Sequence, residues 1–370
     1  MKWLSDDKLE HLRDIAGDPD FSSTKYRIVK ELARGGMGTV YLAEDPELSR
    51  EIAIKVLSTP DVTADRARRM VREAQIIARL EHPGIVPVHD VGHLVDGRVF
   101  YAMKFVRGNR LDEYAARIES IKDRLRKFRA ACDAVAFAHA HGVVHRDLKP
   151  QNIMIGSFGE VLVLDWGIAK ILRELPSIPS EAKTLKFPAR EFADDPPETG
   201  ADLEPTRERL AHDADTTHGT IIGTPLYMSP EQARGEIEQL DERSDVYSLG
   251  AILYFLLTNQ APAATSGPAE ADRWGESGSI SRPRELNSKV SKAAQAVCLK
   301  AMAHASSARY SSAAELSADV GRLLDAEPVS AYSENAIERV GRWLGKNRFL
   351  VFLVLAYLLL RVFFLLTARR

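Results

Sequence analysis

Apolar and polar residues alternate in several stretches of the first hundred residues, a pattern typical of half-buried β-strands. Three such runs, TKYRIVKEL, GTVYLAED and EIAIKVLS, are separated by polar or Gly-rich turns and predict an antiparallel meander. Residues 64–80 then carry apolar side chains at helical spacing, and the runs GIVPVHDVGHL and RVFYAMKFV return to strand character. The pattern predicts a polar lead over residues 1–25, followed by a lobe of five strands and one helix over 26–106.

Beyond residue 106 the pattern becomes mainly helical. A long helix is expected over about 120–141 and an apolar one in SDVYSLGAILYFLLT, while NIMIG and VLVLDWG are short strands. Residues 172–218 contain Pro, Asp and Glu clusters such as FADDPPETGADLEPTRER, which cannot bury much apolar surface. We therefore expect an α+β protein whose second, mainly helical lobe spans 107–325 and carries a mobile acidic insertion.

The end of the chain changes pattern again, from a polar and then basic connector over 326–348 to the apolar run FLVFLVLAYLLLRVFFLL over 349–366. At about 1.5 Å per residue this run is about 27 Å long, and it is apolar all round except at Arg361, which could snorkel. It predicts one transmembrane helix. The positive-inside rule then places both lobes in the cytoplasm, as a single-pass protein of the cell inner membrane with almost nothing outside. The basic residues before the helix are Arg339, Arg342, Lys346 and Arg348.

Composition, the N-terminus and the cysteines add three limits. The 370 residues are 45% hydrophobic and 28% charged, as in ordinary globular proteins, and the formal net charge of -2 gives no reason to expect a nucleic-acid partner. The N-terminus, MKWLSDDKLEHL, lacks the apolar core of a secretory signal. Cys132 and Cys298 lie in apolar helical contexts far apart, so we expect buried free thiols in a reducing compartment.

Candidate chemistry begins in LARGGMGTVYLAED. Gly35, Gly36 and Gly38 let backbone N–H groups approach an anion, although alone they indicate no more than a Gly-rich hairpin. Seventeen residues after Gly38, Lys55 lies among apolar neighbours in a strand and needs an ionic partner there. The following helix offers Glu73. This combination indicates that Lys55 holds phosphates and that Glu73 holds Lys55.

The stretch AHAHGVVHRDLKPQN raises the question of a metal site. His141 and His145 have the spacing of zinc ligands on a helix, but Gly142 between them indicates a helix end. The same stretch places Asp147, Lys149 and Asn152 in a loop, and Asp165 follows the strand VLVL. Because Asp and Asn oxygens suit magnesium, which usually arrives with phosphates, these residues predict a phosphoryl-transfer site.

In chain order, these motifs resemble those of eukaryotic-type (Hanks-type) serine/threonine protein kinases of bacteria, from about Tyr26 to about Asp325. The resemblance implies ATP and Mg²⁺ as cofactors, Asp147 as the residue that accepts the substrate proton, Lys149 as a neutraliser of phosphoryl charge, and Asn152 and Asp165 as metal ligands. It also implies a nucleotide site formed by Ala33, Arg34, Gly35, Gly36, Gly38, Val40, Ala53, Lys55, Glu73, Met103, Lys104 and Val106.

Further residues take structural or regulatory roles through the same resemblance. Arg146 would receive a phosphate from the activation segment, where autophosphorylation is expected on Thr216, Thr217 or Thr220. Thr224 would shape the acceptor site. The remaining expectations are His145 beneath Trp166, a buried pair of Glu231 with Arg309, and Asp245 bracing the catalytic loop.

The sequence also departs from the family pattern. Ala33 replaces the first loop glycine, Trp166 replaces Phe in the metal motif, and the segment from Asp165 to Glu231 is unusually long. A pseudokinase scaffold therefore stays open as the alternative to a membrane-anchored kinase of protein Ser/Thr hydroxyls. A small-molecule phosphotransferase is disfavoured by GTPLYMSPEQ, and a zinc hydrolase lacks a third ligand. Expected partners are protein substrates, the membrane and a second copy for trans-autophosphorylation.

Overall fold

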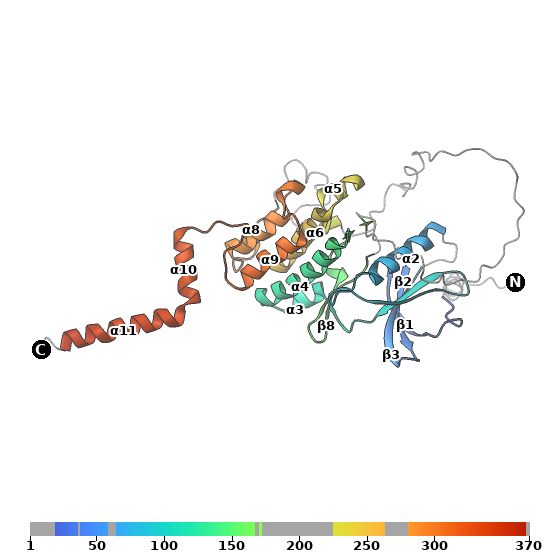
Figure 1. Ribbon diagram of the computed structural model, residues 1–370, viewed down its shortest axis with the longest axis horizontal. Helices are drawn as coiled ribbons and strands as arrows, with labels where there is room; N and C mark the ends of the chain where they lie inside the picture. Colours follow the sequence, from blue (N-terminus) through green and yellow to red (C-terminus); the bar gives the residue numbers. More distant parts are fainter. Residues whose placement is uncertain are drawn as a thin grey trace, which may run out of the picture.

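The computed structural model describes residues 19–35, 38–57, 64–166, 170–171, 225–262 and 280–367. Figure 1 shows a lobe built around a β-sheet, a lobe built mainly of helices, and two further helices that lead away to the C-terminus. Most of the predicted N-terminal lead and the predicted acidic insertion over 172–218 lie outside the described residues.

The first lobe is an antiparallel five-stranded sheet with one helix. The strands are β1 (Arg27–Gly35), β2 (Gly38–Asp45), β3 (Arg50–Val56), β4 (Val88–His93) and β5 (Val99–Lys104), and the helix is α2 (Ala64–Ala78). The sheet order is β1-β2-β3-β5-β4, so the first three strands form the predicted meander and β5 joins β4 to it. Alternation buries Ile52, Ile54 and Phe100 in one layer of the core, while Met70 and Ala74 of α2 pack with Val99 and Tyr101.

The second lobe is mainly helical. Its helices are α3 (Leu111–Arg117), α4 (Ile121–Ala140), α5 (Pro230–Ala233), α6 (Glu242–Thr258), α7 (Pro283–Leu286), α8 (Lys292–Ala301) and α9 (Ala313–Leu324). Short strands are β6 (Gly108–Arg110), β7 (Val143–Val144), β8 (Ile153–Gly156), β9 (Val161–Val163) and β10 (Lys170–Ile171). They form a β6-β8-β9 sheet and a β7-β10 pair. The two-lobed architecture is therefore the one that the sequence predicts.

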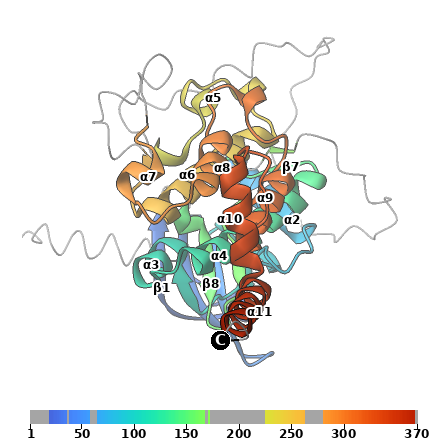
Figure 2. The ribbon, with the colours of Figure 1, turned by 90° about the vertical axis from the view of Figure 1, so that its left-hand side faces the viewer.

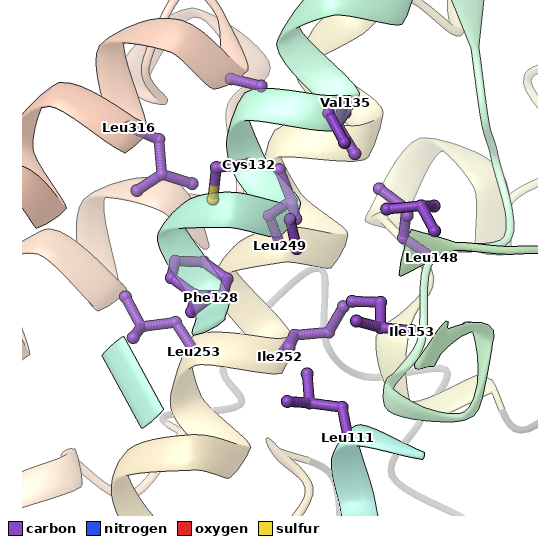
Figure 3. Close-up of a cluster of buried hydrophobic side chains, with 14 of the residues drawn as sticks. Leu111, Phe128, Cys132, Val135, Leu148, Ile153, Leu249, Ile252, Leu253 and Leu316 are labelled. Carbon is purple, nitrogen blue, oxygen red and sulfur yellow. The ribbon is translucent and has the colours of Figure 1, made fainter. Parts of the chain in front are cut away.

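The core of the second lobe lies where α4 and α6 meet. Phe128 of α4 and Ile252 of α6 are fully buried there, and Leu316 of α9 closes the same cluster (Figure 3). Helix α6 is apolar nearly all round because helices cover it on several sides. Cys132 and Cys298 are buried free thiols, as predicted.

Helix α4 ends as its sequence predicts. His141 is its C-cap, and Gly142 follows with a φ of 74°, a left-handed conformation that glycine adopts without strain. Other predicted boundaries shift slightly: α2 stops at Ala78 rather than at residue 80, and β9 stops at Val163. Asp165 has a φ of 59°, so the chain has left extended geometry before it reaches this residue.

Two helices follow the second lobe: α10 (Ala336–Lys346) and α11 (Arg348–Thr367). Figure 2 shows them in front of the helical lobe, and Figure 1 shows α11 pointing away from it. The side chains at 345, 346, 348, 350 and 362–367 lie outside the described part of the chain. Within that part, the structure contains no helix that is both long and apolar enough to cross a membrane. The transmembrane helix predicted over 349–366 therefore stays a prediction.

Candidate active site

Lys55 joins the two lobes. Its position on β3 is opposite Tyr101 of β5, and its side chain is buried. The Lys55 Nζ atom lies 3.1 Å from Glu73 Oε1 on α2 and 2.8 Å from Asp165 Oδ1 in the second lobe. Tyr101 donates its hydroxyl to the same Glu73 oxygen at 2.9 Å. The predicted pairing of Lys55 with Glu73 is present, and Asp165 joins it.

These contacts keep the site ionised. Burial lowers the pKa of Lys55, but the acidic neighbours Tyr101, Asp165 and Glu73 outweigh burial and raise it. Desolvation by the surrounding protein raises the pKa of Asp165, yet the charge of Lys55 and its hydrogen bond lower it below the usual range. At neutral pH the site therefore presents an ammonium group and a carboxylate.

The predicted phosphate loop lies between β1 and β2. Gly35 pairs with Gly38, and Ala33 and Arg34 precede them on the exposed strand β1. A Cβ atom on Gly38 would lie 2.3 Å from the Val56 carbonyl oxygen, so this position requires glycine. Gly36 lies outside the described residues.

The predicted adenine-side residues lie on neighbouring strands. Val40 of β2 pairs with Lys55, and Ala53 of β3 pairs with Met103 of β5. At the end of β5, Lys104 is exposed, and Val106 beyond it is buried. Ala53 and Lys55 are two residues apart and therefore face the same side of the sheet.

The predicted catalytic residues lie together in the loop that follows β7. Lys149 Nζ donates to Asp147 Oδ2 at 2.8 Å. Asn152 Nδ2 donates to the Asp147 carbonyl oxygen at 2.8 Å and to Asp147 Oδ2 at 3.2 Å. The Asp147 carboxylate is thus held between an ammonium group and an amide, in a fixed orientation.

Asp245 of α6 binds the backbone of this loop, as predicted. Its Oδ2 atom accepts hydrogen bonds from His145 N at 2.7 Å and from His139 Nε2 at 2.8 Å, and Oδ1 accepts one from Arg146 N at 2.8 Å. Burial raises the pKa of Asp245, but the hydrogen bond and charge of His139 outweigh burial and lower it. A buried anion therefore fixes the backbone two residues before Asp147.

The histidines do not form the zinc site that their spacing suggested. His139 is buried and bonds to Asp245, whereas His141 lies exposed at the helix end and bonds to Phe137 O at 2.8 Å. His145 packs on Trp166 with ring centroids 4.6 Å apart and planes tilted by 46°, in contact as predicted. In the described ranges, no group of three or more His, Cys, Asp or Glu side chains is placed to hold a metal ion.

Asn152 and Asp165 suit a magnesium ion that arrives with nucleotide phosphates. The Asn152 amide nitrogen is bonded to Asp147, so the amide oxygen is the atom that can face a cation. Leu164 N bonds to Asn152 O at 2.8 Å, which places Asp165 beside Asn152. Asp165 Oδ1 accepts from Lys55, and its second carboxylate oxygen is a hard donor. The donor set fits the ion.

Glu231 and Arg309 form the predicted buried ion pair. Two parallel contacts join them, Arg309 Nη1 to Oε1 at 2.7 Å and Nη2 to Oε2 at 2.8 Å, and Ser244 donates to the same carboxylate. Burial raises the pKa of Glu231, but Arg309 outweighs it and lowers the pKa to about 2. The pair ties α5 to the segment before α9.

Three contacts of the site were not predicted. Tyr101 donates its hydroxyl to Glu73, and His139 bonds to the same Asp245 carboxylate that holds the loop. Gln232 donates to Arg146 O at 2.7 Å. Alternation marks Tyr101 as inward-facing, but no local pattern shows which carboxylate it meets. The predicted activation-segment residues Thr216, Thr217, Thr220 and Thr224 lie outside the described residues.

Comparisons with known proteins agree with this geometry. Residues 26–202 match the family model described as the protein kinase domain. A serine/threonine-protein kinase PknD of Protochlamydia amoebophila is 37% identical over 257 residues, covering 64% of this chain and 23% of that protein. A serine/threonine-protein kinase PknB of Mycolicibacterium smegmatis is 34% identical over 346 residues, covering 87% of this chain and 48% of that protein. The chain thus spans less than half the length of these relatives.

The fold is also that of a solved kinase domain. The Mycobacterium tuberculosis PknI kinase domain superimposes with a TM-score of 0.54 at 23% identity, covering 81% of this chain and 95% of that one. Sequence motifs, site geometry and these similarities lead to one family. The chain belongs to the eukaryotic-type (Hanks-type) bacterial serine/threonine protein kinases, a family that uses ATP as substrate and Mg²⁺ as cofactor.

Proposed function

We propose that this chain transfers the γ-phosphate of ATP to serine and threonine hydroxyls of protein substrates. The observation that carries the proposal is the double contact of Lys55 with Glu73 and Asp165, which joins the phosphate-side residues of one lobe to the metal-side residues of the other. A scaffold that binds partners without phosphoryl transfer has no need of this arrangement. The kinase lobes would span 26–106 and 107–325.

In the proposed reaction each residue has a separate task. Lys55 holds the ATP phosphates, and Glu73 fixes its ammonium group. Asp147 orients the acceptor hydroxyl and accepts its proton, while Lys149 neutralises charge on the transferred phosphoryl group. Asn152 and Asp165 would hold Mg²⁺, which supplies charge neutralisation at the phosphates when bound.

The test is phosphorylation of a generic protein substrate by the purified chain with labelled ATP and Mg²⁺. We expect incorporation on serine and threonine but not tyrosine, lost in Asp147→Asn and Lys55→Met. Matched controls are Asp325→Asn and Lys289→Met, because both side chains are exposed and remote from the site. Equal incorporation by Asp147→Asn and the unchanged chain would instead support the scaffold alternative.

The same site supports regulation by phosphorylation of the activation segment. The Arg146 side-chain atoms Nε and Nη2 are buried and have no hydrogen-bond partner among the described residues. Burial lowers the pKa of Arg146 although the charge of Asp245 opposes this effect, and a phosphate would supply further compensating charge. Thr216, Thr217 and Thr220 are the proposed phosphate carriers, modified by a second copy of the chain.

Mass spectrometry after incubation with ATP tests this regulation. We expect phosphate on Thr216 or Thr217, lower activity in their double alanine variant, and loss of the phosphate-dependent activation in Arg146→Met. Full activity of unmodified protein would contradict it.

We further propose that α11 attaches the kinase to the inner membrane with both lobes in the cytoplasm. Its described side chains are exposed and apolar over residues 352–360, a surface that lipid would cover. Basic residues precede it, as the positive-inside rule requires. Fractionation tests the proposal: the chain should pellet with membranes and resist extraction by high salt, and it should stay in solution if α11 has no such role.

A further inference from the structure

We propose that α10 lies flat in the interface of an anionic bilayer, with its apolar face among the upper acyl chains. The proposal rests on the proposed membrane attachment and adds a second contact, one that sets the orientation of the kinase relative to the membrane. Three observations support it. Helix α10 has one apolar face, its polar side is bound to the helical lobe, and basic side chains lie around it.

Helix α10 has one apolar face, and that face is exposed. Ile337, Val340 and Leu344 are three and four residues apart and share this face, and Trp343 lies at its edge. Their exposed fractions are 82%, 57%, 42% and 54%. Such an exposed apolar stripe on a short helix is typical of interaction sites.

The polar side of α10 is attached to the helical lobe. Glu338 Oε1 accepts a hydrogen bond from Lys292 of α8 at 2.7 Å, and Tyr332 donates to both Glu338 oxygens at 3.0 and 2.9 Å. Asn335 caps the first turn through Glu338 N at 2.8 Å. Glu338 is about 100° round the helix from Ile337, so these bonds turn the apolar face away from the kinase.

The chain that leads to α10 is fixed as well. Asp319 of α9 accepts hydrogen bonds from Ser330 N at 2.9 Å, Ser330 Oγ at 2.7 Å, Ala331 N at 3.2 Å and the Tyr310 hydroxyl at 2.8 Å. Because Asp319 is fully buried, this cluster anchors the connector in the core of the lobe. The position of α10 therefore determines which side of the kinase faces whatever α10 binds.

Charge and continuity indicate a bilayer as the occupant. Arg339 and Arg342 line an open hollow of about 370 Å³ together with Val340 and Trp343. Arg342 is paired with Glu334 at 2.8 Å, so Arg339 is the cation that this surface offers beside its apolar groups. Arginines beside an apolar and tryptophan-containing face are the pattern of helices in the interface of anionic lipids. The apolar helix α11 begins at Arg348, immediately after α10 ends. A second copy of this chain on the same face would bring the two Arg339 side chains together.

The test uses the full chain reconstituted in vesicles of phosphatidylcholine and phosphatidylglycerol, with acyl chains brominated at a shallow or a deep position. The measurement is tryptophan fluorescence. Because Trp343 is one of four tryptophans, its contribution is the difference in fluorescence between the unchanged chain and Trp343→Phe. We expect shallow bromine to quench Trp343 more than deep bromine does. The quenching should fall in vesicles without phosphatidylglycerol, and it should also fall in Arg339→Gln. The equilibrium constant for inserting α10 into the interface should decrease about fivefold for each positive charge lost.

Sedimentation of the same vesicles separates the two proposals. A chain that sediments but shows no Trp343 quenching overturns the inference about α10 and leaves membrane attachment by α11 intact. A chain that stays in solution overturns both. Ile337→Ser should reduce the quenching, whereas Phe158→Ser, a matched change at a fully exposed site in the β8–β9 turn, should not. A Val340→Cys disulfide between copies with no quenching would identify a second copy as the occupant and refute the bilayer.

Discussion

The buried ammonium group of Lys55 has carboxylates from both lobes within hydrogen-bond distance. Each carboxylate offsets the cost of burying the charge, and Tyr101 fixes the orientation of one of them. Removal of Glu73 would leave Asp165 as the remaining carboxylate near Lys55, which would draw the lysine toward the metal side and away from phosphates.

We therefore expect Glu73→Gln to lower kcat/KM for protein phosphorylation. The loss of a charged hydrogen bond costs about 1.5 to 3 kcal/mol, which corresponds to a roughly 10- to 150-fold lower rate constant. Steady-state kinetics at varied ATP measure it. Glu81→Gln, an exposed glutamate just beyond α2, is the matched control and should retain full activity. Equal rates for the two variants would contradict a role for Glu73.

Glu231 is the second buried charge with a defined consequence, in this case for stability. Its pKa is about 2 in the folded protein, below the ordinary value of 4.5. A group with a lowered folded pKa stabilises the protein above its unfolded pKa, and this contribution falls as pH decreases from about 4.5 toward 2. Arg309 is the cause of the lowered pKa.

Arg309→Met should destabilise the folded protein by about 3 to 5 kcal/mol at pH 7, because the variant leaves Glu231 buried without its partner. Denaturant unfolding of the variant and the unchanged chain measures the difference. The difference should shrink as pH falls from about 4.5 toward 2, because the unchanged chain loses the stabilisation from its ionised Glu231 over that range. A difference that is independent of pH would show that lost packing, rather than charge, explains the effect.

At the scale of elements, α6 organises the catalytic loop through one side chain. Asp245 lies in the first turn of α6, where the helix dipole favours an anion. Its two oxygens bind the backbone of His145 and Arg146, and Arg146 has a φ of 69°, a conformation that this bonding holds in place. The position of Asp147 therefore depends on a helix far from it in sequence.

Asp245→Asn should lower kcat and leave KM for ATP nearly unchanged. The new amide nitrogen would face a backbone N–H group, which costs about 1 to 3 kcal/mol, while Lys55 still holds the nucleotide. Kinetics at saturating protein substrate separate the two constants. Asp325→Asn, an exposed aspartate at the end of α9, is the control. A raised KM with unchanged kcat would contradict this role.

At the scale of the whole molecule, nucleotide should hold the lobes together. ATP with Mg²⁺ would contact Lys55 on one lobe and Asn152 and Asp165 on the other, so binding to the folded state adds stability. This stabilisation by bound nucleotide depends on residues of both lobes and requires no phosphoryl transfer. It therefore tests nucleotide binding even if the chain is a scaffold that transfers no phosphate.

A saturating concentration of ATP with Mg²⁺, about 100 times Kd, should stabilise the fold by about 2.7 kcal/mol and raise Tm by about 4 to 5 °C. Thermal unfolding with and without Mg²⁺ measures this. In Asp165→Asn the increase should fall to that seen without Mg²⁺. An increase of the same size in Asp165→Asn, or one independent of Mg²⁺, would contradict the assigned metal ligands.

Much of this molecule could be predicted from local sequence. Alternation in EIAIKVLS and RVFYAMKFV places strands β3 and β5 correctly, and Gly142 marks the end of α4. Motif order indicated Asp147, Lys149, Asn152 and Asp165 because the chemistry requires these residue types within short spacings. Boundaries were less certain, since helix and strand ends depend on contacts that a local pattern does not contain.

Local sequence patterns are sufficient to predict the two lobes, the residues proposed for phosphoryl transfer, and the apolar and basic character of the C-terminal segment. The tertiary structure decided which charges meet: Lys55 with Asp165, 110 positions away, and Asp245 with the backbone of His145. It also decided that α10 presents its apolar face outward, because Glu338 binds Lys292, 46 positions earlier in the chain. Side-chain spacing is a local property of the chain, whereas partners distant in sequence are chosen only when packing brings their elements together.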